Sequence, residues 1–383
     1  MTTFDRAPRL RIDELLSDMR VNVIVCTGSG GVGKTTTAAA LALRAAEMGR
    51  KVCVLTIDPA KRLAQAMGLT VLDNTPRHVA GVTSESGDGE LFAMMLDMKR
   101  TFDEVVESHA DPVRAQQILS NPFYQALSSS FAGTQEYMAM EKLGQLRADP
   151  NASWDLIVVD TPPSRSALDF LDAPARLGSF LDGRLIRILT APARGAGRGL
   201  GRIAAMGFSF FSGVLDRILG AQVLADLGTF VAAIDTTFGG FRERADATYA
   251  LLQARGTAFV VVAAPERDAL REAAYFVERL RTSDMPLAGL VLNRVQTTLA
   301  AELSSEQALA AEQRLQVSGT DPMAAALLEI HAERMNLAAR QHHLAERFTA
   351  AHPGVSVTAV PALAEDVHNL DGLREVGRQL AAK

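Results

Sequence analysis

The sequence predicts an α/β fold with a mainly parallel sheet, helices on both faces and a helical insert subdomain. Three observations favour this fold. Short apolar runs of strand length alternate with segments of helical periodicity along the 383 residues. A glycine-rich turn joins one of the first runs to a helix. Two long helical stretches, residues 101–146 and 179–250, interrupt the alternation. We therefore expect residues 1–383 to form a single domain that carries those stretches as its insert.

The composition is that of an ordinary soluble globular protein, with 48% apolar and 22% charged residues. A net charge of −5 gives no support for nucleic acid as a partner. Cys26 and Cys53 lie in strand-like runs, which predicts buried thiols and leaves no basis for a disulfide framework or a cysteine metal site. The N-terminus has no signal-like apolar region, and no uncharged run reaches the ~18 residues of a membrane span. We expect a cytoplasmic protein, with peripheral membrane association left open.

The first strand, predicted over Val21–Cys26, leads into a phosphate-binding (P-loop) motif. Residues Gly28–Thr35 match Gly-x4-Gly-Lys-[Ser/Thr], and an alanine-rich helix follows. Glycines allow backbone N–H groups to converge on phosphate oxygens, and the helix N-terminus adds positive potential. Lys34 supplies charge to the β- and γ-phosphates, and the Thr35 hydroxyl ligates Mg²⁺. The predicted nucleotide-binding residues here are Gly28, Ser29, Gly30, Gly31, Val32, Gly33, Lys34, Thr35 and Thr36.

A second buried strand, Lys51–Ile57, ends at Asp58. Loops that leave the carboxyl ends of parallel strands face the ligand crevice, so Asp58 is placed to approach the γ-phosphate and to reach Mg²⁺ through water. The alternative interpretation is that Asp58 only caps a helix over residues 60–67.

A strand is predicted over Leu91–Leu96, followed by helical periodicity that breaks near residues 121–122 and 133. We interpret Glu136 and Glu141 in this stretch as solvent-facing helix residues rather than catalysts. The next apolar run ends in Asp160-Thr-Pro-Pro, the second nucleotide signature, whose aspartate holds Mg²⁺ directly or through its water. The proline pair stiffens the exit, so that residues 164–171 can carry a γ-phosphate response away from the site.

Residues 183–201 are rich in arginine, with no acidic residue between the arginines Arg184, Arg187, Arg194 and Arg198. An apolar stripe at helical spacing follows over residues 206–234 and includes Phe210 and Phe211. Two interpretations stay open: helices packed on each other in a lid, or an exposed groove or membrane-facing surface beside a basic collar.

Further strands are predicted over Thr257–Ala263 and Leu287–Val295. Asn293 lies near the end of the second strand. Guanine-specific proteins place an aspartate about three residues after such an asparagine, and Gln296 occupies that position, so adenine is favoured. Helices over residues 303–315 and 322–348 precede a last strand over residues 355–360 and the turn at Pro361.

These motifs resemble the ArsA-type ATPases, which include arsenite-pump ATPases and the targeting factor for tail-anchored membrane proteins. The resemblance covers most of the chain through Gly30–Thr36, Asp58-Pro-Ala, Asp160-Thr-x-Pro, Pro265-Glu with Glu272, Asn293 and Pro361. It implies a deviant P-loop NTPase that works as a dimer with facing nucleotide sites. It also implies that Asp58 orients the attacking water, Asp160 supports Mg²⁺, Asn293 recognises adenine, Pro361 belongs to the nucleotide site, and the helical insert receives client helices.

The chain departs from that family's pattern in three ways. The lysine that reaches across the family's dimer to the partner's nucleotide is replaced by Ser29. The family's zinc-bridging and arsenite-binding cysteines have no counterpart, which argues against metalloid transport. Lys61 replaces the usual histidine after Asp-Pro-Ala. The first departure predicts either a slow homodimer or a heterodimer with a lysine-bearing paralogue.

From these observations we expect a dimeric, Mg²⁺-dependent ATPase that couples its nucleotide state to a hydrophobic client protein or a membrane surface, with no role for nucleic acid. One rival is a partitioning or positioning ATPase of the MinD/ParA type, for which residues 371–383 are too short and mixed to serve as a basic membrane helix. The other is a weakly hydrolysing, nucleotide-bound scaffold subunit of a heterodimer, which Ser29 favours.

Overall fold

The computed structural model describes residues 7–58, 62–84, 87–121, 124–125, 134–150, 152–162, 241–298 and 300–382. The chain divides into two compact units, which are described separately. Unit 1 comprises Met1–Met95, Asn151–Leu168 and Leu251–Lys383, and unit 2 comprises Leu96–Pro150 and Asp169–Ala250. The predicted arginine-rich segment and the apolar stripe of residues 206–234 lie outside the described residues.

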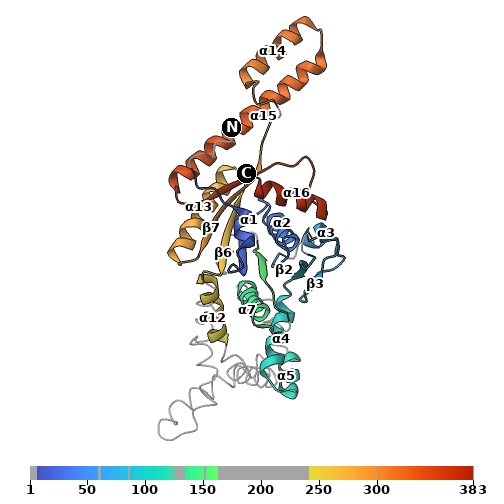
Figure 1. Cartoon of the computed structure of the whole chain (residues 1–383), viewed down its shortest axis with the longest axis vertical. Coiled ribbons are helices and arrows are strands. Elements are labelled where there is room, and N and C mark those ends of the chain that lie inside the picture. Colours follow the sequence, from blue (N-terminus) through green and yellow to red (C-terminus); the bar gives the residue numbers. More distant parts are fainter. Residues whose placement is uncertain are drawn as a thin grey trace, which may run out of the picture. The chain divides into compact units, whose positions relative to one another are not determined.

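Unit 1 is built on a mixed sheet whose described strands run in the order β3-β4-β2-β5-β1-β6-β7-β8 (Figure 1). Every neighbouring pair is parallel except β3 and β4, which are antiparallel at one edge. The strands are β1 (Val23–Thr27), β2 (Lys51–Thr56), β3 (Arg77–His78), β4 (Glu90–Met95), β5 (Leu156–Asp160), β6 (Thr257–Ala263), β7 (Leu287–Val295) and β8 (Val357–Pro361). The predicted α/β class is therefore confirmed, and the two-residue strand β3 is an addition that the sequence pattern did not indicate.

The central strands are apolar on both faces, which is what a parallel sheet between two helical layers requires. All residues of β1, β5 and β6 are buried. Helix α2 (Lys34–Glu47) lies on the sheet through small side chains, because its alanines permit close approach of helix and strands. Cys26 and Cys53 are both buried free thiols, as predicted.

Other helices of unit 1 complete these layers. Helix α16 (Leu370–Ala381) packs against α2 and β8 and buries Leu373, Val376 and Leu380, while α13 (Arg267–Thr282) packs against β6 and β7. Two short helices, α1 (Ile12–Ser17) and α3 (Arg62–Ala66), contact α2. The predicted helix over residues 60–67 is thus shorter in the described region, and residues 59–61 lie outside it.

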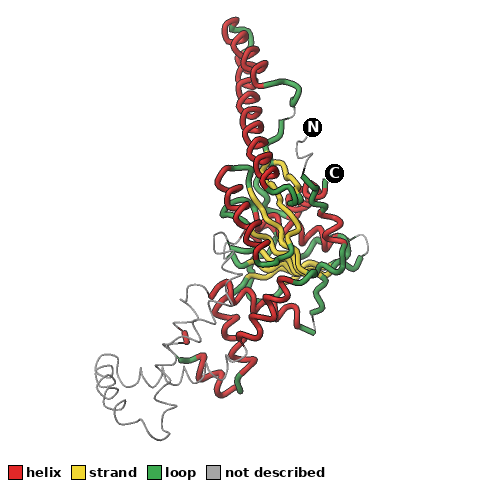
Figure 2. The backbone as a smooth tube through the Cα atoms, turned by 90° about the vertical axis from the view of Figure 1, so that its left-hand side faces the viewer, coloured by secondary structure: helices red, strands yellow, loops and turns green. Residues whose placement is uncertain are grey.

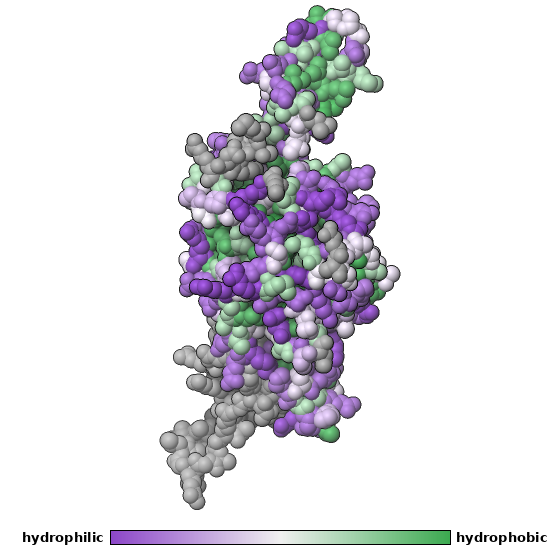
Figure 3. All heavy atoms as spheres, viewed as in Figure 1, coloured by the Kyte–Doolittle hydropathy of each residue, from purple (hydrophilic) through white to green (hydrophobic). Residues whose placement is uncertain are grey.

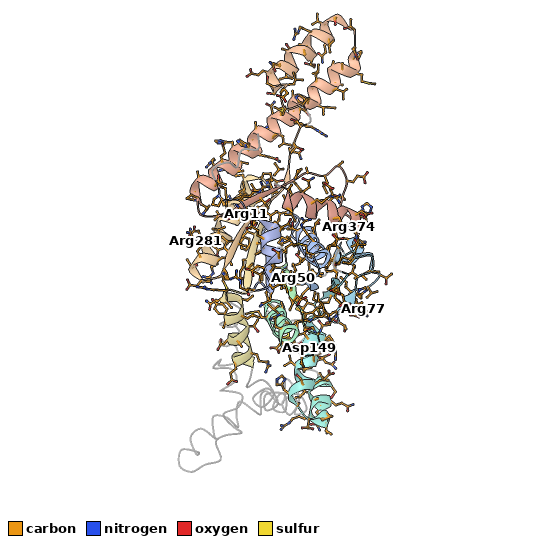
Figure 4. All side chains as sticks on the ribbon, in the orientation of Figure 1. Arg11, Arg50, Arg77, Asp149, Arg281 and Arg374 are labelled. Carbon is orange, nitrogen blue, oxygen red and sulfur yellow. The ribbon has the colours of Figure 1, made fainter. Side chains whose placement is uncertain are left out.

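Two arginines tie distant segments of unit 1 together (Figure 4). The buried Arg50 guanidinium donates to the carbonyls of Leu16 and Val21, at 2.8 and 2.6 Å, and so fixes the entry to β1. Burial lowers the pKa of Arg50, which makes these carbonyl partners necessary. Arg374 on α16 pairs with Glu47 at the end of α2, with 2.7 Å between Nε and Oε1.

A helical hairpin, called the arm below, connects β7 to β8. It consists of α14 (Ser305–Ser318) and α15 (Pro322–Ala351) (Figure 2). Helix α14 begins later than predicted because Ser304 and Gln307 form a capping box, and it ends at Gly319, whose φ is 64°. Helix α15 begins at Pro322, after the capping side chain of Asp321.

Unit 2 is helical in its described part, with α4 (Met98–His109), α5 (Pro112–Leu119), α7 (Thr134–Ala148) and most of α12 (Phe241–Gln253). The first helical stretch has an additional break at residues 110–111, because the Asp111 side chain caps α5 and Pro112 occupies its first position. Helix α5 then ends at Leu119, next to the predicted break near residues 121–122. The interpretation of Glu141 as solvent-facing was wrong. Its side chain is buried and pairs with Arg244 of α12, with 3.0 Å between Oε1 and Nε.

None of the helices in the described part of the chain has both the length and the apolar character needed to cross a membrane.

Candidate functional site

The predicted phosphate loop leaves the end of β1 and enters α2 in a conformation that only glycine tolerates at several positions. Gly28, Gly31 and Gly33 have φ values of 154°, 75° and 94°. A Cβ on Gly28 would lie 2.1 Å from the Val262 carbonyl oxygen, so β6 also forces glycine there. Helix α2 starts at Lys34 with no side-chain cap at Gly33. Its first N–H groups therefore remain available to an anion.

Lys34 is folded back on this loop. Its Nζ donates to the Ser29 carbonyl at 2.7 Å, and its side chain is buried. Burial lowers the pKa of Lys34, and the negative charges of Asp160 and Asp58 oppose this effect. The ammonium group thus lies between the loop and two carboxylates, as a charge that a phosphate group can engage.

The parallel register brings the ends of three strands together around Asp160. Cys26 of β1 and Thr56 of β2 are both register partners of Asp160 on β5. The Thr56 hydroxyl donates to Asp160 Oδ2 at 2.9 Å. Thr56 was not predicted, although its place at the end of β2, two residues before Asp58, was a usable signal.

Asp160 is fully buried and carries an unmatched carboxylate oxygen. Its Oδ1 makes no hydrogen bond to any side chain or backbone group that the structure describes. Burial raises the pKa of Asp160 to about 6, while hydrogen bonds from Thr35 and Thr56 and the Lys34 charge act in the opposite direction. A buried carboxylate with a free lone pair needs a cation or water to compensate its desolvation.

This arrangement fits Mg²⁺. Mg²⁺ prefers oxygen ligands and is usually held by one or two protein groups, with water and substrate phosphates completing the shell. Asp160 Oδ1 and the Thr35 hydroxyl provide two oxygens of this kind beside the phosphate loop.

Asp58 follows β2 and is half-buried. Its backbone N–H donates to the Thr56 hydroxyl at 3.2 Å, and its charge acts on both Lys34 and Asp160. The structure therefore brings together Asp58, Asp160 and Lys34, which the sequence pattern had selected from three separate segments. The first turn of the helix that Asp58 would cap, at residues 59–61, lies outside the described residues.

Asn293 reaches the phosphate loop from the other side. Its Nδ2 donates to the Val32 carbonyl at 2.8 Å, and its Oδ1 accepts from the Arg294 backbone at 3.0 Å. A Cβ on Gly33 would lie 2.1 Å from Asn293 Nδ2, so the glycine is needed for this contact. No other described residue bonds to this amide in the hydrogen bonds of the structure, which leaves one N–H and one lone pair for a ligand such as a purine base.

A cavity of about 600 Å³ lies next to these residues. It lies between the start of α2, α3, the end of β7 and the segment after β8. Among its lining residues are Gly33, Thr35, Thr36, Asn293, Arg294, Gln296 and Pro361. The volume is in the range of small-molecule sites. Predicted residues separated by more than 250 positions thus line one cavity, whereas Lys34, Asp58 and Asp160 are not among its lining residues.

Arg294 was not predicted as a site residue. Its guanidinium Nη1 donates to the Gly31 carbonyl at 3.0 Å, and its φ of 62° is unusual for a residue other than glycine. Only its position next to Asn293 could have indicated it. It adds an exposed cation at the rim of the phosphate loop.

Comparison with known proteins agrees with this geometry. A family model described as anion-transporting ATPase matches residues 21–342. The chain is 25% identical to the ATPase GET3 of Podospora anserina, over 76% of this chain and 78% of that protein. It is 30% identical to the ATPase GET3 of Malassezia globosa over 47% of this chain, and to an arsenical pump-driving ATPase of Escherichia coli over 41%. These two matches span half of the Malassezia protein and 26% of the Escherichia coli protein.

Proposed function

Since this chain belongs to the anion-transporting ATPase family, we propose that it binds ATP with Mg²⁺ and hydrolyses it. The proposal depends on three groups that lie together at the carboxyl ends of β1, β2 and β5. They are the uncapped N-terminus of α2, the buried Lys34, and Asp160, whose Oδ1 has no hydrogen-bond partner among the described residues. A phosphate chain supplies the negative charge that the first two groups need.

Each group has a separate role in this proposal. The loop N–H groups of Gly28–Thr35 hold the β- and γ-phosphate oxygens, and Lys34 leaves the Ser29 carbonyl to contact them. Thr35 and Asp160 hold Mg²⁺, Asp160 directly or through its water. When bound, Mg²⁺ neutralises negative charge that develops on the transferred phosphoryl group. Asp58 orients the attacking water in line with the leaving oxygen.

The cavity beside Asn293 and Pro361 would take the base and ribose. Asn293 has a free N–H and a free lone pair for the adenine edge, and Gln296 lacks the carboxylate that would favour guanine. The base would then lie on the α3 and β8 side of the phosphate loop, because the cavity is lined by residues of those elements.

We also propose that the ATPase acts as a dimer whose nucleotide state controls a client or membrane partner through unit 2. Ser29 supports an asymmetric form of this dimer, because it cannot provide a cation to a neighbouring site as a lysine could. We therefore propose a heterodimer with a lysine-bearing paralogue, in which the paralogue's lysine reaches the nucleotide that this chain binds. A scaffold subunit that scarcely hydrolyses ATP is the second candidate, favoured by the same residue.

Lys34→Ala tests the proposed nucleotide site. The variant should lose ATP affinity and turnover, because the buried positive charge at the loop is gone, while circular dichroism and melting show an intact fold. Lys99→Ala is the matched control, since Lys99 is an exposed lysine that pairs only with Asp103 among the ion pairs of the described residues. Normal ATP binding by the Lys34→Ala protein would contradict the proposal.

A further inference from the structure

The arm reaches the nucleotide cavity through one side chain of its long helix. Gln341, toward the C-terminal end of α15, accepts a hydrogen bond from the backbone N–H of Gln296, with 2.8 Å between Oε1 and N. The two residues are 45 positions apart, and both are half-buried. Gln296 lines the cavity of about 600 Å³ together with Asn293. A residue of the arm is thus bonded directly to the wall of the proposed base site.

This bond forms where the strand ladder ends. Strand β7 ends at Val295, whose carbonyl accepts from the Ala362 N–H of the segment after β8 at 2.9 Å. The next N–H, that of Gln296, lies beyond the strand. A backbone N–H that is shielded from water needs an acceptor, because leaving it unpaired costs free energy. Gln341 supplies this acceptor and so helps to determine the path of the chain as it leaves β7.

Two further contacts hold the same exit segment along α15. The Thr298 hydroxyl contacts Met335 Sδ at 3.3 Å, and His331 Nε2 donates to the Leu303 carbonyl at 2.8 Å. The partners on α15 follow in reverse order, at positions 341, 335 and 331, so the segment runs antiparallel to the helix. The helix therefore guides the chain over several residues after the cavity wall.

Packing anchors the part of α15 that carries Gln341. Ala345 and Phe348 follow at helical spacing on the same face, and both are buried. Helix α15 also packs against α13 of the same unit. Toward its outer end the arm instead exposes large apolar side chains (Figure 3), among them Met323 and Leu327. Gln341 thus lies on the anchored part of the arm, where it can serve as a fixed support for the cavity wall.

The segment from Asn293 to Gln296 is held at both of its ends. Asn293 and Arg294 bond to carbonyls of the phosphate loop, and Gln341 holds Gln296 on the other side. Hydrogen bonds to a base discriminate well only when their donors and acceptors are held within about 0.5 Å of the required positions. Loss of the Gln341 bond would free one end of the segment, so the amides of Asn293 and Gln296 would be less well placed.

We propose that Gln341 is a positioning residue for base recognition, a role that rests on the proposed binding of ATP. Gln341 is not among the residues that line the cavity, and it acts through Gln296. The alternative is that Gln341 only fastens the arm to the sheet. A fastening contact affects stability and changes the affinities for ATP and GTP alike. A positioning contact changes the ratio of the two affinities.

The ATP and GTP affinities of three variants test this role. Gln341→Leu is similar in size but has no acceptor, and it should lower the preference for ATP over GTP roughly three- to tenfold, the value of one hydrogen bond. Gln341→Glu should keep the parent preference, because it retains the acceptor oxygen and its charge acts equally on two ligands of equal charge. Gln316→Leu is the matched control, since Gln316 is exposed on α14. Melting temperatures show whether each variant is folded.

Amide hydrogen exchange in nucleotide-free protein tests the contact itself. Gln341→Leu should speed up exchange at the Gln296 amide, whereas Gln341→Glu and Gln316→Leu should not. Unchanged exchange in Gln341→Leu rejects the contact. Faster exchange with the parent's preference for ATP rejects the positioning role alone and leaves Gln341 as a fastening residue. A parent chain that binds no ATP rejects the proposed function, and this role with it.

Discussion

The Arg294 guanidinium donates to the Gly31 carbonyl at 3.0 Å and so links the end of β7 to a phosphate loop 263 residues earlier in the chain. Arg294 achieves this with a left-handed backbone, φ 62°. A side chain in this conformation costs roughly 1–2 kcal/mol. The protein keeps an arginine there in spite of that cost, which agrees with a role for its charge at the nucleotide site.

Two substitutions separate the charge of Arg294 from its backbone conformation. Arg294→Ala and Arg294→Gly both lose the bond to Gly31, so both should lose ATP affinity to the same extent, about tenfold or less at this exposed position. Only glycine relieves the left-handed strain. Urea unfolding should therefore show Arg294→Gly to be more stable than Arg294→Ala by roughly 1 kcal/mol. Equal stabilities would mean that the backbone is not strained there.

Asp160 should make the stability of the Mg²⁺-free and nucleotide-free protein depend on pH. Its folded pKa of about 6 lies above the usual 3.8, so the folded state binds the proton more tightly than the unfolded state. The ionised carboxylate therefore destabilises the fold above pH 6, on the order of 3 kcal/mol, and this penalty disappears as the pH falls below 4. Asp160→Asn should raise the free energy of unfolding at pH 8 in EDTA and match the parent protein near pH 4. A constant difference across that range would contradict this origin.

Asp58→Asn should retain ATP binding and lose turnover. The amide keeps the shape of the side chain but lacks the charge that orients the attacking water, so the hydrolysis rate should fall by ~10² to 10⁴. Single-turnover hydrolysis and ATP titration, run side by side, measure the two effects. Turnover equal to that of the parent chain would leave Asp58 as a helix cap.

Base preference should follow Asn293 and Gln296. The parent chain should bind ATP more tightly than GTP, and Gln296→Asp should raise GTP affinity because a carboxylate can accept the guanine amino group. Gln296→Glu is the control, because it adds the same charge on a longer side chain. Competition binding with both nucleotides checks the prediction, and equal affinity of the parent chain for ATP and GTP would remove the adenine assignment.

Ser29→Lys tests the asymmetry of the proposed ATPase dimer. A cation supplied by a neighbouring subunit is worth on the order of 10³ to 10⁵ in rate when an arginine finger provides it. The lysine variant should raise the homodimer's turnover at least tenfold, whereas Ser29→Ala should not. A lysine-bearing paralogue added to the parent chain should produce the same increase. Rapid hydrolysis by the parent chain alone, at a rate that neither Ser29→Lys nor the paralogue changes, would argue for a symmetric enzyme.

The two glutamates Glu136 and Glu141 show that helical periodicity predicts a helix but not which of its polar side chains face solvent. Helical spacing placed Glu136 and Glu141 on a helix, and α7 is that helix. Whether such a side chain is solvated depends on the neighbouring helix, and Arg244, 103 residues later, turns Glu141 into a buried ion-pair partner. Helix α4 ends where it does because Asp111 caps the next helix, α5. The capping residue is visible in the sequence, but the spacing of apolar residues does not reveal it.

The sequence by itself determined the fold class and the glycine-rich loop after the first strand, because both depend on local spacing. It also selected Lys34, Asp58 and Asp160 as candidate site residues, since each lies in that loop or at the end of a strand. Tertiary structure alone decided which of these groups meet. The parallel register places Thr56 on Asp160 and leaves its other oxygen unmatched, and the close approach of β7 requires glycine at position 33. It also decided that Phe348 is covered while Leu327 is exposed, since burial depends on what packs against a helix and not on the helix's own pattern.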